Sequence, residues 1–375
     1  MKAEQMWEVS TGENVTVAVI DSGVNSSNPD LVGQVRKGLD LALGSPGDER
    51  VDYEGHGTAM AGLIAGTGRS GNGDGAFGLA PGSKILPIRL RDDAGKVNGA
   101  VGSEHFSEDV SKGIRFSVDH DAKVINISQG DETGSREISE AVKYALGRGA
   151  LIFAAVGNSG DKGNGLEYPA ATPGVVGVGA IGKDVEKTEE SQHGPQVDLS
   201  APGEDMVHAC DGKTGLCKSR GTSDATAIAS ASAALIWSKH PDWTNNQVLQ
   251  VLLNSAGKPK SGAKRSDDVG YGAVRPRIAL KAPGDPGPAD VYPLPDLAAA
   301  ESPSPSPAGA SSERSSGAAA ADAPVTAAPT ADASGSGGGT GLWIGLAAGV
   351  VVLAGAVAVA LAARSRRHSA PRGTG

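Results

Sequence analysis

An aspartate, a histidine and a serine stand in this order in three short glycine-containing segments of the chain. Asp21 lies in the segment DSG, His56 in GHGT and Ser223 in GTSDA. A serine hydroxyl becomes a strong nucleophile when an imidazole takes its proton, and a carboxylate holds that imidazole in the required orientation. The three residues therefore predict a nucleophilic device in which Ser223 attacks, His56 transfers the proton and Asp21 supports the imidazole.

Each of the three residues also has an ordinary structural role open to it. Asp21 directly follows an apolar run and fits a turn or a helix cap. A lone histidine between two glycines, such as His56, is more often solvated or structural. Ser223 precedes a long helical pattern, where serine is usually an N-cap. The catalytic interpretation rests on the combination, because all three lie at the ends of elements, where side chains can face a shared cleft.

The elements that must position these residues follow an alternating pattern. Short runs rich in valine and isoleucine predict buried parallel strands. These runs are Val15–Ile20, Lys84–Leu90, Ala122–Ile127, Leu151–Val156 and Val175–Ala180. The sequence therefore indicates an α/β fold with a doubly wound parallel sheet and helices on both faces. Ligand sites of such sheets lie at the carboxyl ends of the strands.

The segments between the strands carry helical patterns. Apolar residues recur at every fourth position from Phe106 to Val118, and Ile138, Val142 and Ala145 share one face of the next candidate helix. Gly55–Gly66 is predicted to be a helix that starts near His56. The segment Ser223–Lys239 is almost entirely small and apolar, so we expect a central, fully buried helix.

Composition narrows the class of protein. The chain has 375 residues, of which 39% are hydrophobic and 21% are charged, as in an ordinary globular protein with one large core and accessory segments. Aromatic residues are only 3%, so the core must consist of Ala, Val, Ile and Leu. The net charge of -9 argues against nucleic acid as a partner.

The two cysteines, Cys210 and Cys217, are close enough in sequence to close a small loop. A disulfide is expected if the protein resides in an oxidising compartment, and a reduced pair is the alternative. Zinc does not suit this pair, because no second pair of ligands accompanies it. The sequence predicts no metal site; a calcium ion near Asn72 and Asp74 is an alternative to a plain glycine-rich turn there.

The composition changes sharply after Lys281, which predicts four parts of the chain. Residues 282–340 are rich in Pro, Ala, Ser and Gly and are expected to form a disordered linker. Residues 341–363 are uncharged and, as a helix, about 34 Å long, enough to cross a bilayer. The four parts are a catalytic domain over 1–281, the linker over 282–340, a transmembrane helix over 341–363 and a short basic tail over 364–375.

The charges that flank the apolar run predict an orientation. Arg364, Arg366 and Arg367 follow it, whereas no Lys or Arg precedes it back to Arg314. The positive-inside rule places the tail in the cytoplasm and the catalytic domain outside a single-pass cell-membrane anchor. Met1–Trp7 has no apolar core or cleavage site of a signal peptide. We therefore expect that the recorded start lacks the signal that such a topology requires.

Several blocks besides the three segments resemble the subtilases, the subtilisin-like serine peptidases. VINISQG at Val124–Gly130 is similar to the substrate-binding strand of the family, and AAVGNSG at Ala154–Gly160 to the segment with the oxyanion asparagine. Further similar blocks, in the same order, are GLAPGSKILPIRL at Gly78–Leu90, YPAATPGVVGVGA at Tyr168–Ala180 and LSAPG at Leu199–Gly203. The resemblance covers Gly12 to about Leu280 and implies a subtilisin-like fold.

The resemblance also implies an activity and a set of roles. The activity is that of a serine endopeptidase that works through an acyl-enzyme and needs no cofactor. Asn158 and the backbone N–H of Ser223 would form the oxyanion hole. A polypeptide substrate would bind as an extended strand. The residues flanking it would be Ser128, Gln129 and Gly130 on one side and Lys96–Gly99 on the other. Tyr168–Pro169 matches a cis-proline position of the family.

Three positions depart from the family pattern. Asp224 follows the nucleophile where the family usually has an apolar residue, often Met, and Ala227 and Ala231 replace a usual Pro and a common Gly. A carboxylate beside the nucleophile is expected to stabilise the imidazolium form of His56 and to move activity to higher pH. The departures affect the expected substrate preference rather than the triad.

The arrangement of a subtilase domain, a Pro-rich linker, a membrane helix and a basic tail resembles the mycosins. These are membrane-anchored proteases of actinobacterial type VII secretion, so that secretion machinery is an expected partner. An alternative function is that of a structural component of a secretion complex, for which proteolysis is dispensable.

Overall fold

The computed structural model describes residues 2–92, 99–212 and 214–301. Its centre is a seven-stranded sheet with the order β2-β3-β1-β4-β5-β6-β7, in which every neighbouring pair is parallel. The strands are β1 (Thr16–Asp21), β2 (Leu39–Asp40), β3 (Lys84–Arg89), β4 (Val124–Ile127), β5 (Leu151–Ala155), β6 (Val176–Ile181) and β7 (Leu199–Pro202). The predicted α/β class and the five predicted strands are confirmed, with ends shifted by one or two residues.

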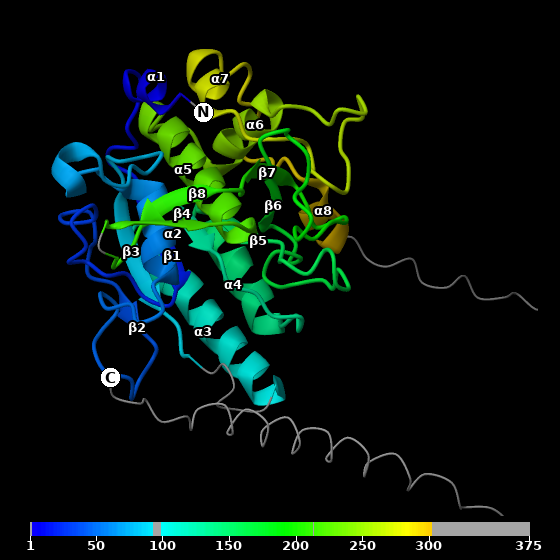
Figure 1. The fold of residues 1–375 in the computed structure, drawn as a ribbon. Coiled ribbons are helices and arrows are strands. Elements are labelled where there is room, and N and C mark those ends of the chain that lie inside the picture. The colour runs from blue at the N-terminus through cyan, green and yellow to red at the C-terminus, as the bar shows by residue number, and fades with distance from the viewer. Residues whose placement is uncertain (1, 93–98, 213, 302–375) are drawn as a thin grey trace, which may run out of the picture. The chain divides into compact units, whose positions relative to one another are not determined.

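Helices cover both faces of this sheet, as the alternating pattern predicts (Figure 1). One apolar layer packs α3 (Gly99–Asp119) and α4 (Arg136–Gly147) on the sheet. The other layer includes α2 (His56–Ala65), α5 (Thr222–Lys239), α6 (Asn245–Ser255) and α7 (Pro276–Lys281). Because both faces are covered, the strands are nearly continuous runs of buried residues, and all four residues of β4 are buried.

Helix α5 runs along the middle of the sheet and is buried over most of its length. It contacts β4, β5, β6 and β7 as well as α2. From Thr222 to Trp237, Ser223 is the one residue that is not buried. Alanine and serine dominate its sequence, and such small side chains let the helix axis approach the strands closely. The predicted buried helix over Ser223–Lys239 is confirmed.

A short antiparallel hairpin, β8 (Met206–Ala209) and β9 (Leu216–Ser219), precedes α5 and was not predicted. Cys210 and Cys217 are joined by a disulfide at the end of this hairpin. Strand β8 lies against α2, where a Cβ placed on Gly62 would be 3.0 Å from the Cβ of Ala209. The hairpin thus rests on the helix that begins at His56.

The remaining elements are short. They are α1 (Ala3–Trp7), the 3₁₀ helix η1 (Ser70–Gly73) and α8 (Pro295–Glu301). Next to η1, the buried Asp30 accepts hydrogen bonds from the backbone of Ser70 and Ala76 and from the Ser70 hydroxyl. The Asp30 carboxylate therefore fixes the conformation of the loop from Ser70 to Ala76. The Tyr168–Pro169 peptide bond is cis.

The predicted boundary between domain and linker is wrong, because the folded domain extends to α8. Leu294 is 2% exposed and belongs to the main core layer. The Tyr292 hydroxyl donates to the Gly174 carbonyl (2.9 Å), and the Gly174 N–H donates to Asp296 (2.8 Å). Composition alone misses this packing, because two large side chains anchor a segment that is otherwise rich in Pro, Ala and Gly.

The rest of the predicted linker, the predicted transmembrane helix over 341–363 and the basic tail over 364–375 lie outside the described residues. Within the described ranges, no helix has the length and apolar character needed to cross a membrane.

Leu294→Ala tests whether residues 282–301 belong to the folded domain. The substitution removes a buried side chain from the core and is expected to lower the free energy of unfolding by about 2–5 kcal/mol in urea denaturation. Leu43→Ala is the matched control, because Leu43 is 85% exposed and its truncation should change stability by less than about 0.5 kcal/mol. Equal stability of the two variants would show that the segment contributes nothing to the fold.

Candidate active site

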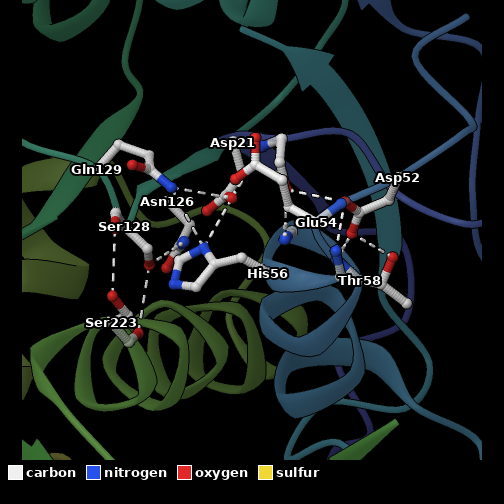
Figure 2. Close-up of polar contacts among 12 residues, drawn as sticks. Asp21, Asp52, Glu54, His56, Thr58, Asn126, Ser128, Gln129 and Ser223 are labelled. Carbon is white, nitrogen blue, oxygen red and sulfur yellow. Dashed lines mark hydrogen bonds and ion pairs between the residues drawn. The ribbon is translucent and has the colours of Figure 1, made fainter. Parts of the chain in front are cut away.

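The candidate residues meet at the carboxyl edge of the parallel sheet. Asp21 is the last residue of β1, and Ser128 directly follows β4, which pairs with β1. Asn158 lies three residues beyond β5. Helices α2 and α5 begin at the same edge and carry His56 and Ser223 in their first turns (Figure 2). Parallel strand polarity therefore gathers side chains from five distant parts of the chain.

Asp21 and His56 form a close pair. Nδ1 of His56 lies 2.7 Å from Oδ1 of Asp21, which is fully buried and also accepts the Ser22 N–H at 2.8 Å. Burial disfavours the Asp21 carboxylate, but the charge and hydrogen bond of His56 outweigh this, so the pKa of Asp21 is lowered. Asp21 in turn raises the pKa of His56 to about 9, against the opposing effect of burial.

The first turn of α2 holds His56 through a residue that the sequence analysis did not single out. Asp52 accepts hydrogen bonds from the N–H groups of Gly55 and Thr58, both at 2.8 Å, and from the Thr58 hydroxyl at 2.6 Å. The Ser22 hydroxyl also donates to Asp52 at 2.9 Å, which ties this turn to the end of β1. The N-cap of α2 is Gly55, so Asp52 lies three residues before the usual capping position, and no local sequence signal identifies it.

Ser223 is the second residue of α5, whose N-cap is Gly221 with a φ of +142° that suits glycine. Its Oγ donates to the Ser128 carbonyl at 3.2 Å, and the Ser128 hydroxyl donates back to the Ser223 carbonyl at 3.2 Å. Figure 2 shows the imidazole of His56 between Asp21 and Ser223. Within the described residues no hydrogen bond joins His56 to Ser223. In substrate-free sites this bond often forms only when substrate binds.

Asn158 presents an amide beside the start of α5. Its Oδ1 accepts the N–H of Thr222 at 2.9 Å and the Thr222 hydroxyl at 3.2 Å, which fixes the orientation of the amide. Nδ2 has no partner among the described residues, and the side chain is exposed. An unused amide donor therefore stands next to the N-terminus of a helix, where backbone N–H groups and the helix dipole also favour negative charge.

Gln129 lies over the Asp21–His56 pair. Its Nε2 is 3.3 Å from Oδ1 of Asp21 and 3.3 Å from Nδ1 of His56 (Figure 2). Sequence analysis placed Gln129 beside the substrate, and the structure adds this contact with the acid–base pair. Of the predicted opposite side of the site, Lys96–Gly99, residues 96–98 lie outside the described residues and Gly99 begins α3.

The strand that precedes Ser128 is tied to α5. Asn126 of β4 accepts the Ser230 hydroxyl of α5 at 3.0 Å, and its Nδ2 donates to the Ser128 hydroxyl at 3.0 Å. Asn126 and Ser230 are both fully buried. This polar link fixes the carbonyl of Ser128 relative to Ser223, and sequence patterns did not identify it.

Asp224 is 1% exposed, and its Oδ1 accepts the Ser219 hydroxyl at 2.5 Å. Burial raises the pKa of Asp224, although the Ser219 hydrogen bond and the nearby His208 and His56 oppose the increase. After Asp21, Asp224 and Asp52 are the further charges that raise the pKa of His56. The upward shift of the His56 pKa by Asp224 agrees with the expectation from the sequence that Asp224 stabilises the imidazolium.

The described residues contain no group of three or more His, Cys, Asp and Glu side chains arranged to hold a metal ion. What the site offers chemically is an acid–base pair, a hydroxyl and an amide donor. This set of groups is suited to acyl transfer.

Comparison with known proteins identifies the relatives of the chain. Residues 12–272 match the model of the Subtilase family. Subtilisin of Bacillus pumilus is 37% identical over 248 residues, which cover 66% of this chain and 85% of that protein. Subtilisin E of Bacillus subtilis is also 37% identical over 248 residues, and the aligned part spans only 61% of its length.

Solved structures include similar proteases. The MycP3 protease from the type VII (ESX-3) secretion system is 31% identical with a TM-score of 0.65, over 74% of this chain and 85% of that chain. MycP1 from Mycobacterium smegmatis is 27% identical with a TM-score of 0.65, over 77% and 85%. A chain of the periplasmic assembly from the ESX-5 inner membrane complex is 27% identical with a TM-score of 0.67, over 78% and 85%.

Asp224→Asn tests the electrostatic coupling between α5 and the imidazole. Removing a negative charge that favours the imidazolium should lower the pKa of His56 from about 9 towards the ordinary histidine value, as followed by NMR titration of its ring protons. The control is Asp290→Asn, because Asp290 is exposed and is not among the charges that shift His56. An unchanged His56 titration in Asp224→Asn would refute the coupling.

Proposed function

The chain belongs to the subtilase family of serine endopeptidases, and we propose that it cleaves polypeptides through a triad of Asp21, His56 and Ser223. The observation that carries this proposal is the 2.7 Å pair of His56 with the buried Asp21, placed beside Ser223 at the start of α5. The mycosin-like structural neighbours support a closer relation to proteases of type VII secretion.

In the proposed reaction, each group of the site has its own step. Oγ of Ser223 attacks the carbonyl carbon of the substrate while Nε2 of His56 takes its proton. The resulting oxyanion accepts hydrogen bonds from Nδ2 of Asn158 and from the backbone N–H of Ser223. The imidazolium, stabilised by Asp21, then protonates the departing amine. Water, activated by the same imidazole, hydrolyses the acyl-enzyme, so the cycle uses no cofactor.

The substrate is proposed to bind as an extended strand beside Ser128, Gln129 and Gly130. The Ser128 carbonyl accepts the Ser223 hydroxyl in the substrate-free structure. When Ser223 turns to the substrate, this carbonyl becomes free to accept a backbone N–H of the peptide. Because neutral His56 is the base, activity should rise with pH through the raised pKa of His56.

The proposed location follows from the sequence beyond the folded domain. We infer a linker that starts after α8 and ends at residue 340, a single membrane-crossing helix over 341–363 and a cytoplasmic tail over 364–375. The uncharged run and the three arginines after it support this topology. The catalytic domain would then act at the outer face of the cell membrane, a location compatible with the disulfide between Cys210 and Cys217.

Labelling with a fluorophosphonate tests the chemistry. The purified protein should be labelled on Ser223, and Ser223→Ala should lose both labelling and peptide cleavage. Asn158→Ala should still be labelled but should lower kcat about 100- to 1000-fold, the range known for loss of such a donor in subtilisin itself. A protein that is never labelled, with cleavage unaffected by Ser223→Ala, would refute the enzymatic proposal.

A structural role in a secretion complex is a second proposal, and one observation favours it. The chain is similar to a component of the periplasmic assembly of the ESX-5 inner membrane complex, so related folds do occur within such assemblies. In this role the domain would contribute its surface, and cleavage would be dispensable.

Comparison of Ser223→Ala with deletion of the whole protein separates the two roles in the producing organism. If proteolysis is the essential contribution, the point variant should lose secretion of the substrates of the system as completely as the deletion. Normal secretion by Ser223→Ala, together with loss in the deletion, would assign the essential role to the scaffold.

A further inference from the structure

The carboxylate of Glu167 lies between the two segments that follow β4 and β5. A Cβ placed on Gly130 would be 2.5 Å from Oε2 of Glu167, and one placed on Gly157 would be 2.3 Å from Oε1. Side chains at these two glycines would therefore occupy the position of the carboxylate. Because neither glycine has a Cβ, a gap remains between the two backbone segments. The carboxylate of Glu167 lies in this gap.

Two backbone contacts and one side chain hold Glu167 in this gap. Its neighbour Tyr168 pairs with Asp131 in an antiparallel bridge, with N–O distances of 2.7 and 3.0 Å, so that Glu167 lies alongside Gly130. On the other side, Gln192 donates its backbone N–H to the Gly157 carbonyl at 3.0 Å and its Nε2 to Oε1 of Glu167 at 2.8 Å. The carboxylate is thus oriented before any ligand binds.

Among the described residues, no lysine or arginine forms an ion pair with the partly buried carboxylate of Glu167. Asp109 is paired with Arg91 and Glu190 with Arg220. Burial raises the pKa of Glu167, the Gln192 hydrogen bond lowers it, and Glu132 and Asp131 raise it further, with no lysine or arginine among these influences. Its Oε2 has no hydrogen-bond partner among the described residues. The gap therefore combines negative charge with an unused acceptor.

The segments on both sides of the gap contact Ser223 or its neighbours in α5. Ser128, two residues before Gly130, accepts the Ser223 hydroxyl through its carbonyl at 3.2 Å. Asn158, which follows Gly157, is bonded to Thr222 and packs on Gly221. If a peptide places its reacting carbonyl between Ser223 and Asn158, the side chain of that same residue is directed between the two glycine-containing segments, towards Glu167.

We propose that Glu167 selects substrates with lysine or arginine at the residue whose carbonyl Ser223 attacks (P1). A long cationic side chain would reach Oε2 of Glu167 and supply the missing counter-charge. A large apolar side chain would desolvate the carboxylate without compensation and is disfavoured. This inference rests on the proposed peptidase function and adds the class of substrate to it.

Peptide amides that differ only at P1, with lysine, arginine, norleucine or leucine, test the preference. The wild-type protein should cleave the lysine and arginine peptides with kcat/KM about 100-fold above that of norleucine, the uncharged analogue of lysine. Glu167→Gln should lower kcat/KM for the two basic peptides about 100-fold and change that for norleucine less than about threefold. The preference should also decline at low pH, as Glu167 becomes protonated.

Glu137→Gln is the matched control, because it removes an exposed carboxylate in the first turn of α4 and should leave every ratio unchanged. Fluorophosphonate labelling counts the active sites of each variant, so misfolded Glu167→Gln would be detected. Where turnover is too slow, labelling rates with lysyl and norleucyl phosphonate diesters give the same comparison.

The outcomes separate the two proposals. A labelled wild-type protein that prefers norleucine or leucine, or a Glu167→Gln variant that keeps the basic preference, overturns the role of Glu167 alone. A wild-type protein that neither reacts with any phosphonate nor cleaves any peptide overturns the peptidase proposal, and the role of Glu167 with it.

Discussion

The close packing of α5 against the sheet is the constraint on which the site depends. A helix can lie directly under β4 to β7 only if its side chains are small, and α5 meets this condition with alanine and serine over most of its length. Its N-terminus then lies at the carboxyl edge of the strands, where the Asn126–Ser230 hydrogen bond fixes it relative to β4. Ser223 is thereby held within 3.2 Å of the Ser128 carbonyl.

Electrostatics at this edge are dominated by carboxylates. Asp21 is fully buried and ionised because His56 pairs with it, and Asp52 and Asp224 add to the negative environment of the imidazole. An imidazolium is therefore favoured, which suits the charge that would develop on His56 in the proposed acyl transfer. As a consequence, a smaller fraction of His56 is uncharged, and thus able to accept a proton, at neutral pH. Glu167 extends the negative charge to the adjoining gap, where no lysine or arginine of the described residues is paired with it.

Much of the fold was predictable from local pattern. Valine- and isoleucine-rich runs identified β1, β3, β4, β5 and β6, since strands buried on both faces must be continuously apolar. The short strands β2 and β7, the β8–β9 hairpin and the packed segment 282–301 were missed, because their positions depend on partners far away in sequence. Leu294 illustrates the reason: nothing near it in the chain indicates that a core lies opposite.

By itself, the sequence determined the α/β class and the subtilase relationship and singled out Asp21, His56, Ser223 and Asn158 as the candidate site, because motifs and periodicity are local properties of a chain. Only the tertiary structure decided which further side chains adjoin them. Asp52 accepts hydrogen bonds from the backbone around His56, Gln129 covers the Asp21–His56 pair, and Glu167 enters the gap beside Gly130 and Gly157. These relations depend on distances between segments that are separate in the chain, and such distances are set only when the sheet and α5 pack together.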